Sequence, residues 1–262
     1  MFNKKSNIVV AITTSDFDAL RISVPPLRAL RRRFTLVIHN DNPNQKLTPH
    51  MVRKLGWRGR MHIINSEKNL GELESKLNLV EFIRDKKIPC DWIMIANDTD
   101  VVIDVEIPNV DNNTFAIVHN AVTIFESVAD IFKISPKWVN GAPIGKTGPH
   151  FDIVGTMIRA DILFEFSEFI RQMLPDIYKM LSQTKSHVPA STLLWAGLNT
   201  FMHGRHPEMS PIYMNTTNYV AIKIGQMGPV NVVVTKAVSA ITKKFAKIIE
   251  IGTSQNMVAE EQ

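Results

Sequence analysis

Short apolar segments and helical patterns alternate along the first hundred residues. Residues 7–13, 34–39, 61–65 and 92–96 form apolar runs of strand length, most of them followed by polar turn formers. Ahead of the last run, apolar residues recur at helical spacing from Leu70 to Asp85. Two shorter helices are predicted from prolines that suit a first helical turn, over residues 25–33 and 49–55. This alternation predicts an α/β fold in which helices flank a mostly parallel central sheet.

The second half has a different pattern. Strands are predicted over residues 114–125 and 152–160, and the stretch between them contains a Pro/Gly-rich loop over residues 134–151. Helical patterns follow over residues 161–174 and 192–202. This half therefore continues the α/β pattern less regularly than the first.

A basic amphipathic helix is predicted near the end of the chain, over residues 236–250. Its apolar residues share one helical face: Val238, Ile241, Phe245, Ile248 and Ile249. Lys236, Lys243, Lys244 and Lys247 lie at other positions. Such a helix suits contact with a membrane surface, and it equally suits packing on the domain or in a homodimer interface.

Composition and charge narrow the class of protein. The 262 residues are 45% hydrophobic and 21% charged, as in ordinary globular proteins. The net charge of +5 would suit phosphorylated substrates, anionic lipid or nucleic acid. The basic clusters at residues 28–34 and 236–250 lack interleaved aromatic residues, so no nucleic-acid partner is expected. The single cysteine, Cys90, excludes an internal disulfide. We expect a cytoplasmic protein without a signal peptide or membrane-spanning helix.

Two carboxylates two positions apart follow the fourth predicted strand, in the sequence Asn97-Asp98-Thr99-Asp100. Ligands of parallel α/β sheets bind beyond the carboxyl ends of the strands. Paired carboxylates can chelate Mn²⁺ or Mg²⁺, which would neutralise a diphosphate. The alternative is a polar turn without a ligand.

Polar residues follow each of the four strands in an ordered series. In chain order they are Thr13, Thr14 and Asp16, then Asp41, then Asn69, Gly71 and Lys76, and finally Asn97, Asp98 and Asp100. This series resembles the GT-A (Rossmann-like) fold of glycosyltransferases, and particularly glycosyltransferase family 2. The resemblance covers residues 7–104 and continues more weakly towards residue 205.

The resemblance implies roles for these residues. The end of the first strand and Asp41 would hold the nucleoside, Lys76 would assist the phosphates, and Asp98 and Asp100 would bind Mn²⁺ or Mg²⁺ with the diphosphate. A late histidine completes the metal site in many such enzymes, which makes His203 or His206 a candidate ligand. The residues that would together bind the nucleotide-sugar are Thr13, Thr14, Asp16, Asp41, Asn69, Gly71, Lys76, Asn97 and Asp98.

The function implied is metal-dependent transfer of a sugar, with inversion, from a nucleotide-diphosphate donor to a hydroxyl of a saccharide or lipid-linked saccharide. Such transfer would serve polysaccharide or glycolipid assembly, peripherally on the inner face of the membrane. The chain would be a single domain over residues 1–262. Within it, residues 1–104 would bind the nucleotide-sugar, residues 105–230 would form the acceptor-side half, and residues 231–262 the basic amphipathic tail.

The catalytic base departs from the family pattern. Ala190 and Ser191 occupy the positions where the family carries acids, and neither can take a proton as an ordinary base. Asp152, Glu208 and His187 are the candidate substitutes, and we predict Asp152 and Glu208 as catalytic. One alternative is a nucleotide-sugar-binding protein with little or no turnover. The second, a sugar-phosphate nucleotidyltransferase, would usually carry a glycine-rich basic loop after the first strand, which is absent here.

Overall fold

The fold is seen in a computed structural model. It describes residues 6–29, 33–98, 100–102, 110–118, 156–183, 190–213 and 221–223. The Pro/Gly-rich stretch, Asp152, His187 and the basic segment 236–250 lie outside these residues. Within the described part of the chain, no helix has both the length and the apolar character needed to cross a membrane.

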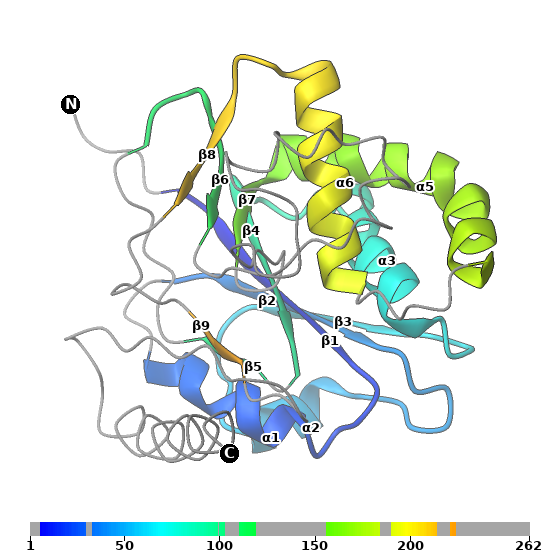
Figure 1. The fold of residues 1–262 in the computed structure, drawn as a ribbon. Coiled ribbons are helices and arrows are strands. Elements are labelled where there is room, and N and C mark those ends of the chain that lie inside the picture. The colour runs from blue at the N-terminus through cyan, green and yellow to red at the C-terminus, as the bar shows by residue number, and fades with distance from the viewer. Residues whose placement is uncertain are drawn as a thin grey trace, which may run out of the picture.

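A seven-stranded sheet in the order β3-β2-β1-β4-β7-β6-β8 forms the centre of the molecule (Figure 1). The first four strands pair in parallel. Only β7 runs against its neighbours, β4 and β6, and β6 pairs in parallel with β8. The strands span Ile8–Thr14 (β1), Thr35–Asn40 (β2), Met61–Asn65 (β3), Trp92–Asn97 (β4), Thr114–Val118 (β6), Met157–Arg159 (β7) and Ser210–Tyr213 (β8). The predicted mostly parallel α/β sheet, as in a GT-A (Rossmann-like) fold, is confirmed.

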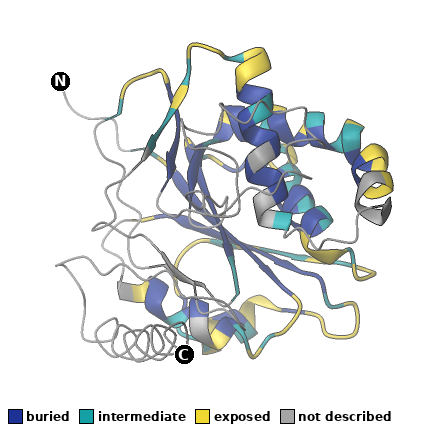
Figure 2. Cartoon of the chain, in the orientation of Figure 1, coloured by how far each residue is buried: buried dark blue, intermediate teal, exposed yellow. Residues whose placement is uncertain are grey.

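Helices cover both faces of this sheet (Figure 2). Alternate residues of β1 point to opposite faces: Val9 and Ala11 pack with α3, α5 and α6, while Val10 and Ile12 pack with α1, η1 and α2. Because both faces are buried at β1, β2 and β4, these strands carry runs of apolar residues without alternation. The helices span Leu20–Ser23 (α1), Pro49–Lys54 (α2), Gly71–Asp85 (α3), Ala160–Gln183 (α5) and Ala190–Arg205 (α6), and the 3₁₀ helix η1 spans Pro25–Ala29.

Two local predictions need correction. The helix predicted to end at Leu174 continues through Pro175 to Gln183 as α5. Proline removes one backbone donor from a helix, but Ile177 beyond it is fully buried and Tyr178 donates a 2.8 Å hydrogen bond to Glu74 of α3. These contacts hold the last turns against the core. The helix predicted from Pro25 is a 3₁₀ helix that ends by Ala29 in the described residues.

A second, two-stranded sheet was not foreseen. β5 (Asp100–Val102) pairs antiparallel with β9 (Ala221–Lys223), so that Asp100 lies opposite Lys223. Asp98 and Asp100 therefore stand on either side of the point where the chain leaves the large sheet and enters the small one.

Candidate functional site

Polar residues from three parallel strands meet at the carboxyl edge of the sheet. Thr13 of β1 lies in register with His39 of β2 on one side and with Asn97 of β4 on the other. Thr14 lies in register with Asn40. The structure thus brings together side chains that are more than eighty residues apart in sequence.

Asp98 is fixed against the end of β1. Its backbone N–H donates to the Thr13 carbonyl at 3.2 Å, and its Oδ2 accepts a hydrogen bond of 2.7 Å from Thr14 Oγ1. The same Thr14 oxygen accepts the backbone N–H of Asp16 at 3.1 Å. Thr14 therefore connects the β1 turn to the first carboxylate of the pair.

Asp41 holds the start of α3. Its two carboxylate oxygens accept the backbone N–H groups of Leu70 at 2.7 Å and Gly71 at 2.9 Å, and its own N–H donates to the Thr14 carbonyl at 2.7 Å. Asn69 Oδ1 also accepts the Gly71 N–H, at 3.0 Å. A carboxylate at a helix N-terminus satisfies donors that the helix leaves open. Asp41 is only 6% exposed, so in this structure it orders the β2 end and the 69–71 turn.

Gly71 has a backbone conformation that favours glycine. Its φ is +78°, in the left-handed region, and an added Cβ would meet no atom within 4 Å. The requirement for glycine is therefore one of backbone angle and not of space around the residue.

Lys76 is a buried lysine, 1% exposed, in the second turn of α3. Its Nζ donates to Glu72 Oε1 and to Asn97 Oδ1, both at 2.8 Å, and approaches Thr13 Oγ1 at 3.5 Å. An ammonium group has three protons, and these three oxygens match that number. Lys76 therefore connects α3 to the ends of β1 and β4. Its predicted contact with phosphates stays a prediction.

Two buried side chains of this edge were missed from the sequence. His39 is fully buried, and its Nε2 lies 3.1 Å from Ser66 Oγ. Burial lowers the pKa of His39, and the nearby Asp41 opposes this shift less strongly. Asn40 Nδ2 donates to Asn65 Oδ1 at 2.9 Å and so joins β2 to β3. Their positions at strand ends were the only signal, since neither belongs to a motif.

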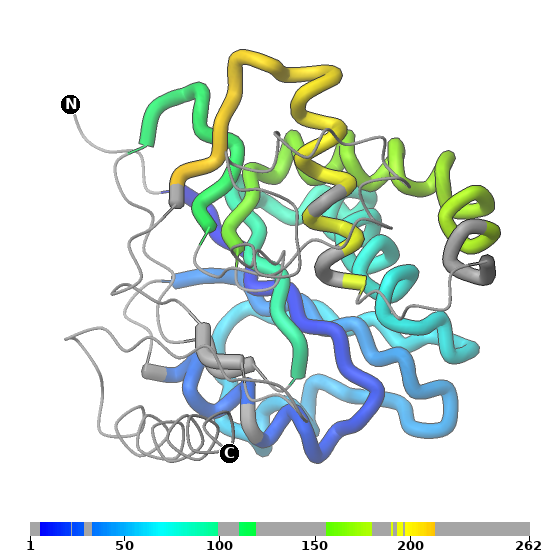
Figure 3. The backbone as a smooth tube through the Cα atoms, viewed as in Figure 1, coloured from blue at the N-terminus to red at the C-terminus, as the bar shows by residue number. Residues whose placement is uncertain are grey.

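His203 and Glu208 are not brought together with Asp98. His203 lies near the end of α6, and Glu208 lies in the turn that enters β8. Figure 3 traces the backbone from α6 through this turn into β8. β8 begins beside the start of β6, where Ser210 N donates to the Asn113 carbonyl at 2.9 Å, and β6 runs in the same direction as β4. Both residues therefore lie towards the amino ends of these strands, while Asp98 follows the carboxyl end of β4. His206 there contacts Glu165 at 3.0 Å.

The start of α6 lies at the other end of the strands, on the side of their carboxyl ends. A helix that leads into a parallel strand begins on the carboxyl side of the sheet, which places Ala190 on the side of Asp98. No acidic residue stands in the first turn of α6. The first turn of α6 therefore lies on the same side of the sheet as Asp98 and carries no carboxylate.

Two residues near this edge could hold a divalent cation. Asp98 follows β4 and Asp100 begins β5, and carboxylate oxygens are the ligand type that Mg²⁺ and Mn²⁺ prefer. Among the described residues there is no cluster of three or more His, Cys, Asp or Glu side chains that could hold a metal by themselves.

Comparisons with known proteins place the chain only distantly. No protein-family model and no curated protein matches it. Among solved structures it is similar to TarS of S. aureus, at 13% identity and a TM-score of 0.36. The match covers 61% of this chain and 29% of TarS. At this level of similarity the function has to be inferred from the residues of the chain itself.

Proposed function

We propose that this chain is a metal-dependent glycosyltransferase that takes a sugar from a nucleotide-diphosphate donor. The supporting observation is the contact of Asp98 with Thr14, at the carboxyl edge where β1, β2, β4 and the start of α3 meet. Ligands of open α/β sheets bind at this edge. The acceptor would be a hydroxyl of a saccharide or lipid-linked saccharide, attacked with inversion as the family resemblance implies.

Each residue of the edge would have a distinct task. Asp98 and Asp100 would hold Mn²⁺ or Mg²⁺, which supplies neutralisation of the diphosphate charge when bound. Thr14 would orient the Asp98 carboxylate through its hydroxyl. Asp41 would act as a positioning residue that holds the turn at Gly71 next to the nucleoside. The side chains would thereby be ordered before the donor binds, which lowers the cost of binding.

A second candidate function is binding of a nucleotide-sugar without turnover. The observation that favours it is the first turn of α6, which begins at Ala190 and carries no acid. Without a base within hydrogen-bond reach of the acceptor hydroxyl, transfer would lose the contribution of proton removal, about 10²–10⁴-fold in rate.

Calorimetric titration tests the proposal. UDP, GDP, CDP and dTDP are titrated with and without Mn²⁺ into the wild type, Asp98→Asn and Asp176→Asn. Asp176 is exposed on α5, so its variant is a control with the same change of charge. We expect one nucleotide to bind, and to bind only when Mn²⁺ is present. Its affinity should fall at least about tenfold in Asp98→Asn and stay unchanged in Asp176→Asn. If none of the four nucleotides binds under either condition, the proposal fails.

The two candidate functions are separated by turnover. The wild type and Ala190→Asp are incubated with the diphosphate-sugar of whichever nucleotide binds, and hydrolysis is measured, in which water accepts the sugar and the nucleoside diphosphate is released. Release by the wild type supports the transferase. Tight binding without release in the wild type, together with release by Ala190→Asp, supports the binding protein.

A further inference from the structure

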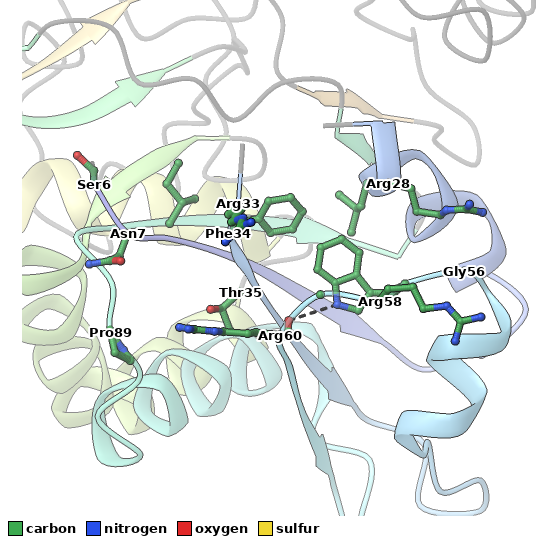
Figure 4. Close-up of a pocket in the computed structure, with 14 residues that line it drawn as sticks. Ser6, Asn7, Arg28, Arg33, Phe34, Thr35, Gly56, Arg58, Arg60 and Pro89 are labelled. Carbon is green, nitrogen blue, oxygen red and sulfur yellow. Dashed lines mark hydrogen bonds between the residues drawn. The ribbon is translucent and has the colours of Figure 1, made fainter. Parts of the chain in front are cut away.

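A cleft of about 810 Å³ lies at the amino ends of the parallel strands, at the opposite end of the strands from Asp98 (Figure 4). Its walls come from the start of β1 at Ser6–Ile8, the start of β2 at Phe34 and Thr35, and the loop over residues 56–60 between α2 and β3. These segments mark the amino ends of the parallel strands. The cleft therefore takes no part in the carboxyl-edge site described above.

Four arginines line this cleft: Arg28, Arg33, Arg58 and Arg60. All four are exposed, and none of the described residues that line the cleft is acidic. Within the described part of the chain, none of the four has a carboxylate in ion-pair distance, whereas Arg84 pairs with Asp85 and Glu168. A concave surface with charge of one sign focuses the field and attracts counter-ions. The cleft is thus strongly positive.

The wall that carries these arginines has fixed packing. The Trp57 indole N–H donates to the Arg60 carbonyl at 3.2 Å, and the Trp57 ring centroid lies 5.0 Å from that of Phe34. An added Cβ at Gly59 would come within 2.4 Å of the Trp57 ring, so a larger residue there would displace the ring. The loop therefore presents Arg58 and Arg60 from a rigid base.

Arg28 is held at the same wall by a second glycine. Gly56 has a φ of +98°, and an added Cβ would lie 2.8 Å from Arg28 Nη1. The Arg28 side chain thus rests directly on the Gly56 backbone. A side chain at position 56 would push Arg28 away from this wall of the cleft.

We propose that the cleft binds a small soluble anion that carries two or more phosphate groups. Planar guanidinium groups match phosphate oxygens in a bidentate manner, and four of them exceed what one phosphate needs. A nucleic-acid strand is disfavoured because Phe34 and Trp57 are only 8% and 6% exposed and cannot stack with bases. A membrane surface is disfavoured because the site is recessed, and the exposed large apolar residue of the described chain, Tyr178, lies on α5. This proposal does not depend on the proposed function.

Calorimetric titration with inorganic tripolyphosphate tests the site. The experiment is run at about 0.15 M salt, where exposed charges are screened beyond about 8 Å. Divalent cations are left out, so that the Asp98 edge does not contribute. The wild type is compared with the double variant Arg58→Ala/Arg60→Ala and with Arg53→Ala/Arg205→Ala. Arg53 and Arg205 are exposed and lie outside the cleft. Both double variants lose two positive charges, so they differ only in where the charges are removed.

We expect tripolyphosphate to bind the wild type, and its dissociation constant to rise at least about tenfold in Arg58→Ala/Arg60→Ala but less than about twofold in the control. No binding to the wild type, or equal weakening in both variants, would overturn the proposal. Binding to phosphatidylglycerol vesicles without binding to tripolyphosphate would also overturn it, in favour of a membrane surface. Arg58→Gln/Arg60→Gln repeats the test if the alanine variant unfolds.

Discussion

Replacing the buried Lys76 by methionine should destabilise the fold and loosen the carboxyl edge of the sheet. Methionine keeps the unbranched shape and similar volume, so little space is left empty in the core. What is lost is the ammonium group, which donates to Glu72 and Asn97 at 2.8 Å each. The substitution therefore isolates the polar link between α3, β1 and β4 from side-chain packing.

The size of the effect follows from the exposure of the partners. Hydrogen bonds to charged groups contribute about 1.5–3 kcal/mol each, so the two bonds set a range of about 3–6 kcal/mol. Two effects reduce this. Glu72 has a side chain 45% exposed and can rehydrate when Lys76 is removed. The desolvation of the buried ammonium is also relieved, which makes apolar replacement of a buried ion less costly. We expect the free energy of unfolding to fall by about 2 kcal/mol.

Urea unfolding, followed by far-ultraviolet circular dichroism, measures this change directly. Lys54→Met is the matched control, because Lys54 is exposed at the end of α2, and we expect it to shift the free energy by less than about 0.5 kcal/mol. Glu72→Gln should cost less than Lys76→Met, because it leaves the Asn97 bond in place. If Lys76→Met is as stable as Lys54→Met, the reasoning about Lys76 as a structural link is refuted.

Three further predictions concern the same edge. Asp41→Ala removes the acceptor of two N–H groups at the start of α3 and should lower the free energy of unfolding by about 1–2 kcal/mol in urea. Gly71→Ala should cost about 1 kcal/mol because of its positive φ, whereas Gly204→Ala, in a helix with open space around it, should be neutral or stabilising. Burial lowers the pKa of His39 below 6.5, so the unfolded chain binds more protons than the folded chain below that pH, and stability falls on acidification. Thermal unfolding at about pH 7.5 and about pH 5.5 measures this fall. We expect the melting temperature to drop less between the two pH values in His39→Asn than in the wild type or in His62→Asn.

The sequence predicted the first four strands to within one residue at each end, and α3 to within one residue at its start. β1, β2 and β4 are buried on both faces and α3 carries a clear helical period, so local pattern and tertiary packing agree in these elements. The short pairing of β5 with β9 could not be foreseen, because strand pairing between residues 100 and 223 depends on long-range contacts that no local pattern encodes. The end of α5 was misjudged for a related reason. Tertiary contacts of Ile177 and Tyr178 outweigh the local effect of Pro175.

The sequence indicates which polar residues follow the strands, but it does not indicate which parts of the chain those residues contact. An acid and a lysine after successive strands can each contact a ligand or support the backbone, and spacing alone does not separate the two. The structure separates them by their partners: both oxygens of Asp41 accept backbone N–H groups, and Lys76 donates to oxygens of three elements. Variants of these two residues should therefore change stability and ligand affinity together. Asp98 follows the last residue of β4 and accepts a hydrogen bond from Thr14. Asparagine has nearly the same shape as aspartate but lacks its charge. If Asp98→Asn lowers the nucleotide affinity and leaves the free energy of unfolding unchanged, the ligand contact belongs to the carboxylate itself.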